Sequence, residues 1–309
     1  MTGPFVVHAN RRTVPVRLRT RGKPGESPVT AYLFLLPALV AYTLFAIVPI
    51  VHTVVVSFFQ WDGVTPAIWV GLDNFTSVLG DPLFQQALLN AVLFVPFYTA
   101  LPLAIGLLLV VAMTRSRIRG RTVFRTLLFL PYTLSLVVVA VAWGWMFDAH
   151  GTIDTLLNAV GLGSLIRPWL GDFTLALPSL GVMGAWVWYG LAMVLFLAGV
   201  QRIPRDLYDA ARIDGAGPFR ELLAVTLPSL KYELSVIITL TILSALRNFD
   251  LVYVATRGGP GNSTLTPALL MYEDAFQYGQ LGAGAAIAVI LTALSLTAII
   301  IVQRLFERG

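Results

Sequence analysis

A charge-dense stretch, residues 201 to 231, lies between two long apolar segments of this chain. Within it, Arg205 and Asp209 have the i, i+4 spacing of a helical ion pair, and Asp209 and Arg212 have the i, i+3 spacing. The stretch also carries several small residues: Ala210, Ala211, Gly215 and Ala216. Small side chains let another backbone approach closely, so the stretch predicts a protein-docking surface. The alternative is a helix that contacts only lipid headgroups, which the mixture of acids and bases disfavours.

A second polar group interrupts an apolar segment further along the chain. Leu234 to Leu246 is too short to cross a bilayer, so a span here has to include Arg247, Asn248 and Asp250. Polar and ionisable residues inside a membrane usually face a bundle interior or a water-filled cavity. Two roles remain open, an Arg247–Asp250 ion pair near the outer interface or contact of Asn248 or Asp250 with a transported solute.

Three aromatic residues crowd another apolar segment: Trp186, Trp188 and Tyr189. Aromatic rings stack on the apolar faces of sugars, and the tryptophan NH and tyrosine OH can bond to hydroxyl groups. Anchoring at a membrane interface is the competing role. Because the three residues lie well inside their segment, we expect them to line a cavity.

The sequence lacks the motifs of the common catalytic and metal sites. A phosphate-binding loop needs a lysine directly after its glycines, but the only lysines are Lys23 and Lys231, and neither follows such a pattern. The three histidines are scattered, and there is no cysteine. We therefore expect no metal, no cofactor and no ATP hydrolysis in this chain, and we interpret the glycines of residues 258 to 261 as a turn.

The polar groups are set in a chain with the composition of a membrane protein. Of 309 residues, 57% are hydrophobic and 12% are charged, and the apolar residues form long blocks that do not alternate as barrel strands would. Because only helices or closed barrels satisfy the backbone in hydrocarbon, we predict an all-α integral membrane protein with six transmembrane helices. The predicted spans are Tyr32 to Phe58, Ala87 to Met113, Val123 to Phe147, Leu180 to Val200, Leu234 to Thr256 and Gly282 to Leu305.

The arginines predict the orientation. They are frequent before the first span and in the connection after the second, whereas residues 59 to 86 contain three aspartates and neither Lys nor Arg. By the positive-inside rule, we predict a basic cytoplasmic tail over residues 1–31, a membrane domain over 32–305 with a cytoplasmic loop at 201–231, and a cytoplasmic tail over 306–309. The net charge of +5 then belongs to one membrane side and indicates no nucleic-acid partner.

The loop of residues 201 to 231 has signals for two short helices. Pro204 suits a first helical turn, and Asp214-Gly215 suits a helix end, because glycine readily takes the left-handed conformation. Gly217-Pro218 then begins a second helix that we expect to run to about Thr226 and to be broken at Pro228. Apolar spacing from Thr152 to Gly163 predicts a further short amphipathic helix on the outer surface.

Several motifs of the chain carry a resemblance to a known family. They are Tyr208-Asp209-Ala210-Ala211, Asp214-Gly215-Ala216, Phe219 and Thr226-Leu227-Pro228 in the loop, and Thr256 to Thr264, Met271-Tyr272 and Ala275-Phe276 further on. The loop resembles the EAA loop of binding-protein-dependent ABC importer permeases, and the later segment resembles the carbohydrate subfamily of the maltose and glycerol-3-phosphate type. Asp209 stands where the family usually has glutamate, and Lys231-Tyr232-Glu233 stands where it often has another proline.

The resemblance implies the ABC type I importer permease bundle, with a cytoplasmic coupling helix, in the cytoplasmic (inner) cell membrane. The chain would be the permease subunit of an ATP-driven importer for a sugar or sugar derivative, such as a disaccharide, oligosaccharide, polyol or glycerol-phosphate. The implied partners are a second homologous permease subunit, two ATPase subunits that bind ATP and Mg, an extracytoplasmic substrate-binding protein and membrane lipid. An ion-coupled secondary transporter is the alternative, although we find no carboxylate near a span centre and no internal repeat.

In that family the EAA loop docks into a groove of the ATPase. The residues that the resemblance and the loop chemistry assign to ATPase coupling are Arg205, Tyr208, Asp209, Ala210, Ala211, Asp214, Gly215, Ala216, Phe219, Leu227 and Pro228. Asn248 also matches a sugar-contacting asparagine of maltose-type permeases. The predicted substrate pathway therefore contains Trp186, Trp188, Tyr189, Asn248 and Asp250.

Overall fold

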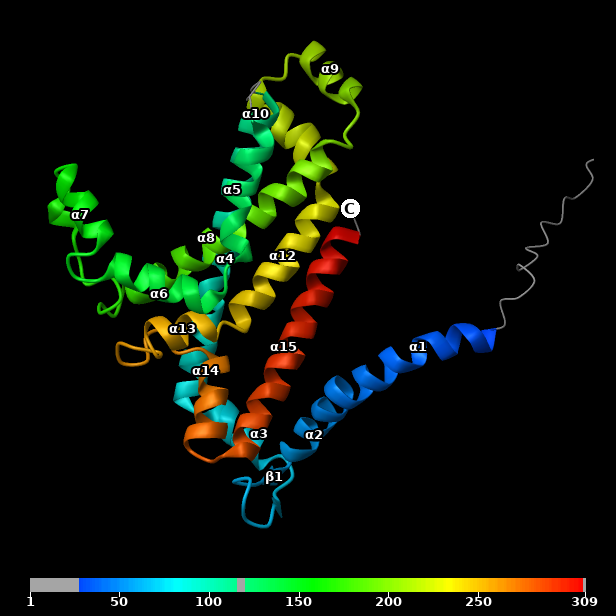
Figure 1. Cartoon of the computed structure of the whole chain (residues 1–309), viewed down its shortest axis with the longest axis vertical. Helices are drawn as coiled ribbons and strands as arrows, with labels where there is room; N and C mark the ends of the chain where they lie inside the picture. Colours follow the sequence, from blue (N-terminus) through cyan, green and yellow to red (C-terminus); the bar gives the residue numbers. More distant parts are fainter. Residues whose placement is uncertain (1–27, 116–119, 308–309) are drawn as a thin grey trace, which may run out of the picture. The chain divides into compact units, whose positions relative to one another are not determined.

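The structure is a computed structural model that describes residues 28–115 and 120–307 (Figure 1). The predicted basic tail therefore lies almost wholly outside the described residues, as do residues 308 and 309 of the predicted C-terminal tail. The chain forms two compact units that divide after Val51. Each unit is described by itself.

The described part of the first unit is a single apolar helical segment. Helix α1 (Pro28–Tyr42) continues through the π-helical turn η1 (Thr43–Ile47) into α2 (Val48–Val56), whose end belongs to the second unit. Pro49 has no N–H to donate to the preceding turn, and the wider turn η1 lies directly before it. Tyr32 to Val56 is long and apolar enough to cross a membrane.

The second unit begins with a small folded segment after α2. Strands β1 (Phe59–Gln60) and β2 (Ile68–Trp69) pair antiparallel, and α3 (Asp73–Gly80) follows them. The side-chain amide of Asn74 donates to the carbonyl oxygens of Ser57 and Phe59, each at 2.9 Å. These bonds tie α3 to the end of α2.

Three long helices of the second unit are single candidate spans. They are α4 (Pro82–Arg115), α8 (Ala176–Val200) and α15 (Leu281–Glu307). Helices α4 and α8 pack along each other at glycines. A Cβ added to Gly106 would lie 2.9 Å from Ala192 Cβ and 3.0 Å from Met193 N, and one added to Gly184 would lie 2.2 Å from Tyr98 Cζ. Close packing of small residues is a main source of stability between helices in lipid.

The predicted third span is bent and not straight. Helices α5 (Arg121–Thr133) and α6 (Leu136–Phe147) meet at 97°. Pro131 lies in the last turn of α5, and Leu134 and Ser135 are extended, so the helix cannot continue through them. This stretch is therefore either a broken span or a re-entrant segment.

The predicted fifth span is wrong in its outer part. Helix α12 (Lys231–Leu246) ends before the polar group, residues 247 to 249 are not helical, and α13 (Asp250–Ala255) is separate. The break is stable because Thr266 Oγ1 donates to the carbonyl oxygen of Asn248 at 2.7 Å, in a buried position. At its other end, α12 makes an angle of 77° with the segment Pro218–Ser229.

Short elements connect the long helices. They are α7 (Thr152–Ala159), η2 (Gly163–Leu165), α9 (Arg205–Ile213), α10 (Pro218–Glu221), η3 (Leu222–Thr226), α11 (Leu227–Ser229), α14 (Pro267–Tyr272) and η4 (Glu273–Gln277). Helix α7 lies within the predicted amphipathic helix. Its Asp154 is buried, and its carboxylate accepts a hydrogen bond from Trp169 Nε1 at 3.0 Å, which compensates for the lost water.

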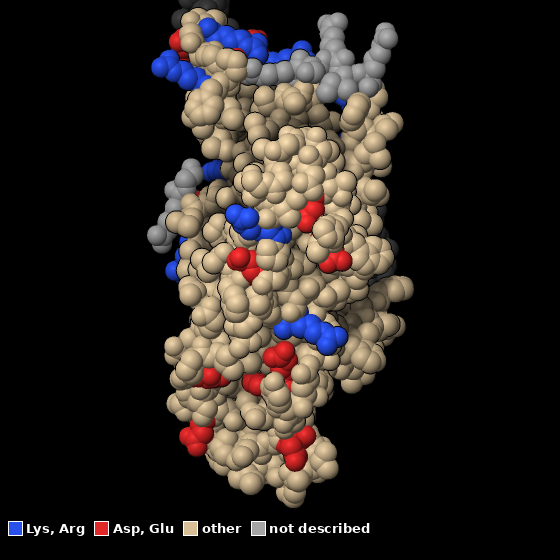
Figure 2. Space-filling model, turned by 90° about the vertical axis from the view of Figure 1, so that its left-hand side faces the viewer, with Lys and Arg blue, Asp and Glu red and all other residues tan. Residues whose placement is uncertain are grey.

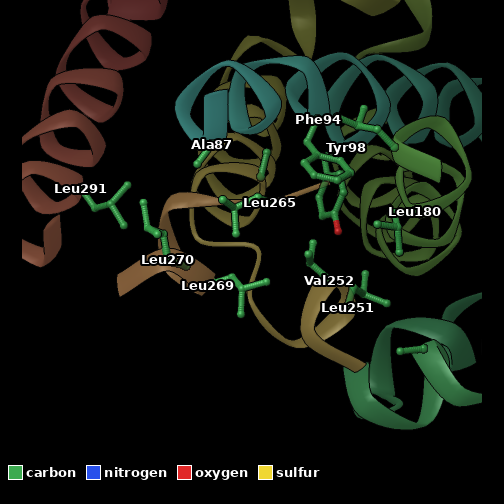
Figure 3. Packing of buried hydrophobic residues seen from close by; sticks show 14 of the residues in the cluster. Ala87, Phe94, Tyr98, Leu180, Leu251, Val252, Leu265, Leu269, Leu270 and Leu291 are labelled. Carbon is green, nitrogen blue, oxygen red and sulfur yellow. The ribbon is translucent and has the colours of Figure 1, made fainter. Parts of the chain in front are cut away.

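Buried apolar side chains form two clusters along α4 and α8. The larger cluster joins Phe94 and Tyr98 of α4 to Leu180 of α8, Leu251 of α13 and Leu269 of α14 (Figure 3). The smaller cluster joins the other ends of α4 and α8 to Leu230 and to α12. The packed seam between α4 and α8 thus runs through both clusters.

Charged side chains are distributed unequally between the two ends of the second unit. On the face in view, acidic side chains and no basic ones occupy the end that carries the β1–β2 hairpin and η4, and basic side chains gather at the end that carries α9 (Figures 1 and 2). The acids of the first end are in the hairpin, α3 and its end, and η4: Asp62, Asp73, Asp81, Glu273 and Asp274.

We expect Gly106→Val to destabilise the chain by about 1–3 kcal/mol, because the new side chain overpacks the seam against Ala192 and the backbone of Met193. Gly144→Val is the matched control, since Gly144 is also helical and has nothing within 4 Å of a Cβ. Thermal unfolding of the detergent-purified chain measures the difference. Equal stability of the two variants would contradict the proposed close packing.

Candidate functional site

The loop that follows α8 is built around helix α9. Gly215 has φ +77° and ends α9, because its N–H donates to Arg212 O at 3.0 Å while the N–H of Ala216 donates to Ala211 O at 2.9 Å. This pair of bonds is the Schellman arrangement, in which the left-handed residue is usually glycine. The predicted helix end at Asp214-Gly215 is therefore present.

Side chains tie α9 to the segment that follows it. Arg212 Nε donates to Glu221 Oε1 at 2.8 Å, and Arg212 Nη1 donates to Asp209 Oδ1 at 3.2 Å. Glu221 is buried, and its hydrogen bond and negative charge raise the pKa of Arg212. The hydroxyls of Tyr208 and Thr226 are hydrogen-bonded at 3.0 Å. The loop is therefore held as one folded piece and is not a loose connection.

Two details of this loop differ from the sequence-based predictions. Asp209 pairs with Arg212 as predicted, but in the described part of the chain it does not pair with Arg205. Pro228 does not break the second helix, because the wider π-helical turn η3 directly before α11 accommodates the missing N–H and the helical segment runs on to Ser229. The chain turns instead at Leu230, whose φ and ψ are −92° and 13°.

The predicted coupling residues lie on the outer side of this loop or support it. Ala210, Gly215 and Phe219 are exposed, and nothing lies within 4 Å of a Cβ at Gly215. Arg205, Asp209, Asp214 and Pro228 are exposed as well, whereas Tyr208, Ala211, Ala216 and Leu227 are half-buried. The loop thus presents a surface of small and charged residues. Tyr208 and Leu227 are half-buried and support this surface from the inner side of the loop.

Sequence reasoning missed a strongly exposed apolar residue in this loop. The side chain of Ile213 is 87% exposed at the end of α9, and Phe219, at the start of α10, is 71% exposed. Large apolar side chains that are so exposed on a charged loop indicate contact with another protein. The signal was present in the sequence, because Ile213 is an apolar residue directly before the helix stop.

The root of the loop is closed by an ion pair that the sequence did not reveal. Arg202, after the end of α8, donates to the buried carboxylate of Glu233 in the first turn of α12. Gly199 leaves the space for this carboxylate, since a Cβ there would lie 2.8 Å from Glu233 Cδ. Glu233 is part of the segment that departs from the family's usual proline.

The polar group after α12 is divided between interior and surface. Asn248 is only 4% exposed, and its Nδ2 atom has no hydrogen-bond partner among the residues that the structure describes. Arg247 and Asp250 are exposed, and among the described residues they do not form the predicted ion pair. Asn248 is therefore the buried residue of this group, and its side-chain amide can still donate a hydrogen bond.

The three predicted pathway aromatics point to different neighbours. Trp186 packs edge-on against Trp143 of α6 at 5.8 Å between ring centroids, and Trp188 packs against Tyr132 of α5 at 5.5 Å. Tyr189 is half-buried like the other two. The rings thus contribute to packing of α8 against α5 and α6, and each leaves part of its surface accessible.

A row of aromatic rings, also missed by sequence reasoning, joins α13 to α14 and η4. Phe249, Tyr253, Tyr272 and Phe276 follow one another with centroids 5.1 to 5.4 Å apart.

Next to this row, the pKa of Asp274 is raised to about 6, because burial desolvates its carboxylate and Asp81 and Glu273 add negative charge. No three His, Asp or Glu side chains of the described residues come together as a possible metal site.

Comparison with known proteins identifies the family. The sequence profile of the family described as "Binding-protein-dependent transport system inner membrane component" matches residues 102–309. The chain belongs to this family. It is 32% identical over 313 residues to the diacetylchitobiose uptake system permease protein NgcF of Streptomyces coelicolor, covering 96% of this chain and 88% of NgcF. It is also 32% identical over 252 residues to the lactose transport system permease protein LacF of Rhizobium radiobacter, covering 81% and 84%.

A solved structure shares the fold of this permease. A chain of a bacterial ABC transporter involved in the import of the polysaccharide alginate superposes with a TM-score of 0.77 at 20% identity, covering 91% of this chain and 96% of that chain. The predicted type I importer permease fold is thereby confirmed. The protein is a permease subunit of an ABC importer, and the ion-coupled alternative receives no support.

We expect Tyr208→Phe to loosen the loop of residues 201 to 231, because the hydrogen bond to the buried Thr226 hydroxyl is lost. A neutral hydrogen bond contributes about 0.5–1.5 kcal/mol, so backbone amides of α9 should exchange with deuterium roughly 2- to 13-fold faster. Tyr232→Phe is the control, since Tyr232 is 68% exposed beyond the loop. The double variant Tyr208→Phe/Thr226→Val tests the coupling of the two hydroxyls. If its amide exchange were accelerated by the full product of the two single-variant factors, the hydroxyls would not be coupled.

Proposed function

We propose that this permease couples ATP hydrolysis on separate ATPase subunits to import through the loop of residues 201 to 231, whose root is closed by the Arg202–Glu233 ion pair. The observation that carries the proposal is the construction of this loop. Ion pairs of buried Glu221 and Glu233 hold it together, and it exposes Ile213, Phe219 and the small crest at Gly215. A folded loop with an exposed apolar and small-residue surface can transmit a push from a docked protein.

The mechanism follows from the way in which the loop is rooted. The Arg202–Glu233 pair joins the end of α8 to the start of α12, so a displacement of α9 is passed to both helices. Closure of two ATPase subunits that bind ATP and Mg would tilt the loop and these helices. The cavity between this chain and a second homologous permease subunit would then open toward an extracytoplasmic substrate-binding protein.

The proposed substrate is a sugar or sugar derivative. Support comes from NgcF and LacF, whose names assign diacetylchitobiose and lactose transport to permeases of this sequence type. Within this chain, the buried amide of Asn248 and the partly accessible rings of Trp186, Trp188 and Tyr189 suit hydroxyl groups and the apolar faces of a sugar. Asp250, two residues after Asn248, is exposed and is also a proposed contact.

The proposed orientation places the α9 loop and both termini in the cytoplasm. The positive-inside rule supports it, because basic side chains gather at the α9 end and acidic ones at the hairpin end (Figure 2). Residues 1–31 and 306–309 would then be cytoplasmic tails of the membrane domain formed by residues 32–305.

The coupling proposal predicts that Gly215→Trp blocks transport and ATPase docking. The indole occupies the open crest where the partner has to approach. Gly161→Trp is a matched control, because Gly161 has the same φ of +77° and the same open surroundings but follows α7 on the other side of the membrane. Both variants bear the same backbone strain, so only a surface role separates them.

Co-purification of the cognate ATPase with each variant, and uptake by reconstituted complexes, make the comparison. Gly161→Trp should retain ATPase docking and substrate uptake, whereas Gly215→Trp should lose both. Retention of both by Gly215→Trp would refute the coupling surface, and equal loss in both variants would assign the defect to backbone strain.

The pathway proposal predicts that Asn248→Ala weakens substrate binding in the cavity by roughly 2- to 13-fold, the effect of one neutral hydrogen bond. Trp188→Ala should also lower uptake. Ser295→Ala is the control, because Ser295 of α15 is another buried polar residue whose hydroxyl has no partner. Uptake assays at varied substrate concentration measure the change. Wild-type behaviour of Asn248→Ala would place the pathway elsewhere.

A further inference from the structure

A hollow of about 220 Å³ lies where α4 and α8 end and α5 begins. Its polar lining comes from Thr114 of α4, Arg121, Thr122 and Arg125 of α5, and Gln201 after α8. None of its lining residues is an acid. The hollow is separate from the surface that α9 presents and from Asn248.

The lining concentrates positive charge in one place. Arg121 and Arg125 are four residues apart and therefore lie on the same face of α5. In the part of the chain that the structure describes, no Asp or Glu forms an ion pair with Arg125. The hollow also adjoins the N-terminal end of the 13-residue helix α5, whose first turn has no acidic residue and whose dipole adds positive potential.

The same helix also exposes apolar side chains on another face. Val123, Phe124 and Leu127 are 62%, 52% and 60% exposed. In the proposed orientation, a basic hollow at the cytoplasmic ends of these helices would lie at the depth of the lipid headgroups. Basic pockets between transmembrane helices on the cytoplasmic side are suited to the phosphates of anionic lipids.

We propose that this hollow binds the phosphate of an anionic phospholipid, with Arg121 and Arg125 on the phosphate. Thr114, Thr122 and Gln201 supply hydrogen-bonding groups to the remaining oxygens. The cytoplasmic location of the site rests on the proposed orientation, whereas the binding chemistry does not. A lipid held here would join the ends of α4, α5 and α8, next to the root of the α9 loop.

The test is lipid retention by the full-length chain. The chain is purified and reconstituted in nanodiscs of phosphatidylcholine with a titrated fraction of phosphatidylglycerol, and bound lipid is counted by native mass spectrometry. One arginine near an anionic headgroup is worth roughly a fivefold change in affinity, so Arg125→Gln should weaken phosphatidylglycerol binding by about fivefold and Arg121→Gln/Arg125→Gln by more. Arg125→Lys should retain most of the binding.

Arg304→Gln is the matched control, because Arg304 is an exposed arginine in the last turn of α15 that does not line the hollow. Equal binding by Arg125→Gln and Arg304→Gln, or equal retention of phosphatidylcholine and phosphatidylglycerol, would overturn the proposal. Thermal stabilisation by millimolar inorganic phosphate in detergent that matches stabilisation by phosphatidylglycerol, and that Arg125→Gln abolishes, would also overturn it in favour of a soluble anion. None of these readouts requires ATPase or transport, so their outcome is independent of the coupling loop.

Discussion

Every turn of this chain inside its apolar helices depends on finding a protein partner for the backbone groups that the turn exposes. Hydrocarbon offers no hydrogen bonds, so an unpaired carbonyl or amide there costs several kcal/mol. The structure meets this requirement with polar side chains from distant segments. Thr266 bonds the Asn248 carbonyl where α12 stops, and the Asn90 amide donates to Leu265 O at 2.9 Å, a residue far along the chain. These few bonds allow non-helical segments to lie beside the proposed pathway.

The same requirement explains which parts of the fold could be predicted. Four spans were readable as single helices, because long uninterrupted apolar blocks leave the backbone no other solution. The outer part of the fifth span was not readable. Its interruption at Arg247 depends on a hydroxyl from Thr266, and no local pattern indicates that partner. The bend between α5 and α6 had a local signal in Pro131, but many prolines are accommodated inside transmembrane helices, so the residue type alone could not decide.

The α9 loop shows the same division. The glycine stop and the Asp209–Arg212 pair follow from residue type and spacing, and both are present. Glu221 and Glu233 could not be assigned in advance, since each meets its arginine through the folding of the loop and not through helical spacing. The family motif therefore marks the crest of the loop, while ion pairs outside the motif, at residues 202, 221 and 233, keep it folded. Asn248 was found because it interrupts an apolar segment, and a resemblance added support. Only the structure shows that it is buried and that its Nδ2 atom has no hydrogen-bond partner among the described residues.

The glycine seam between α4 and α8 limits how this permease can change shape. With Gly106 against Met193 and Gly184 against Tyr98, the two helices have no room to slide or rotate past each other. We therefore expect them to move as a single rigid body. Bending is left to the places where regular helix is already interrupted, after Thr133, at Leu230 and from Arg247 to Phe249. The stiff pair would then serve as the frame, and one of the proposed joints, from Arg247 to Phe249, is the break that brings the side chain of Asn248 into the interior.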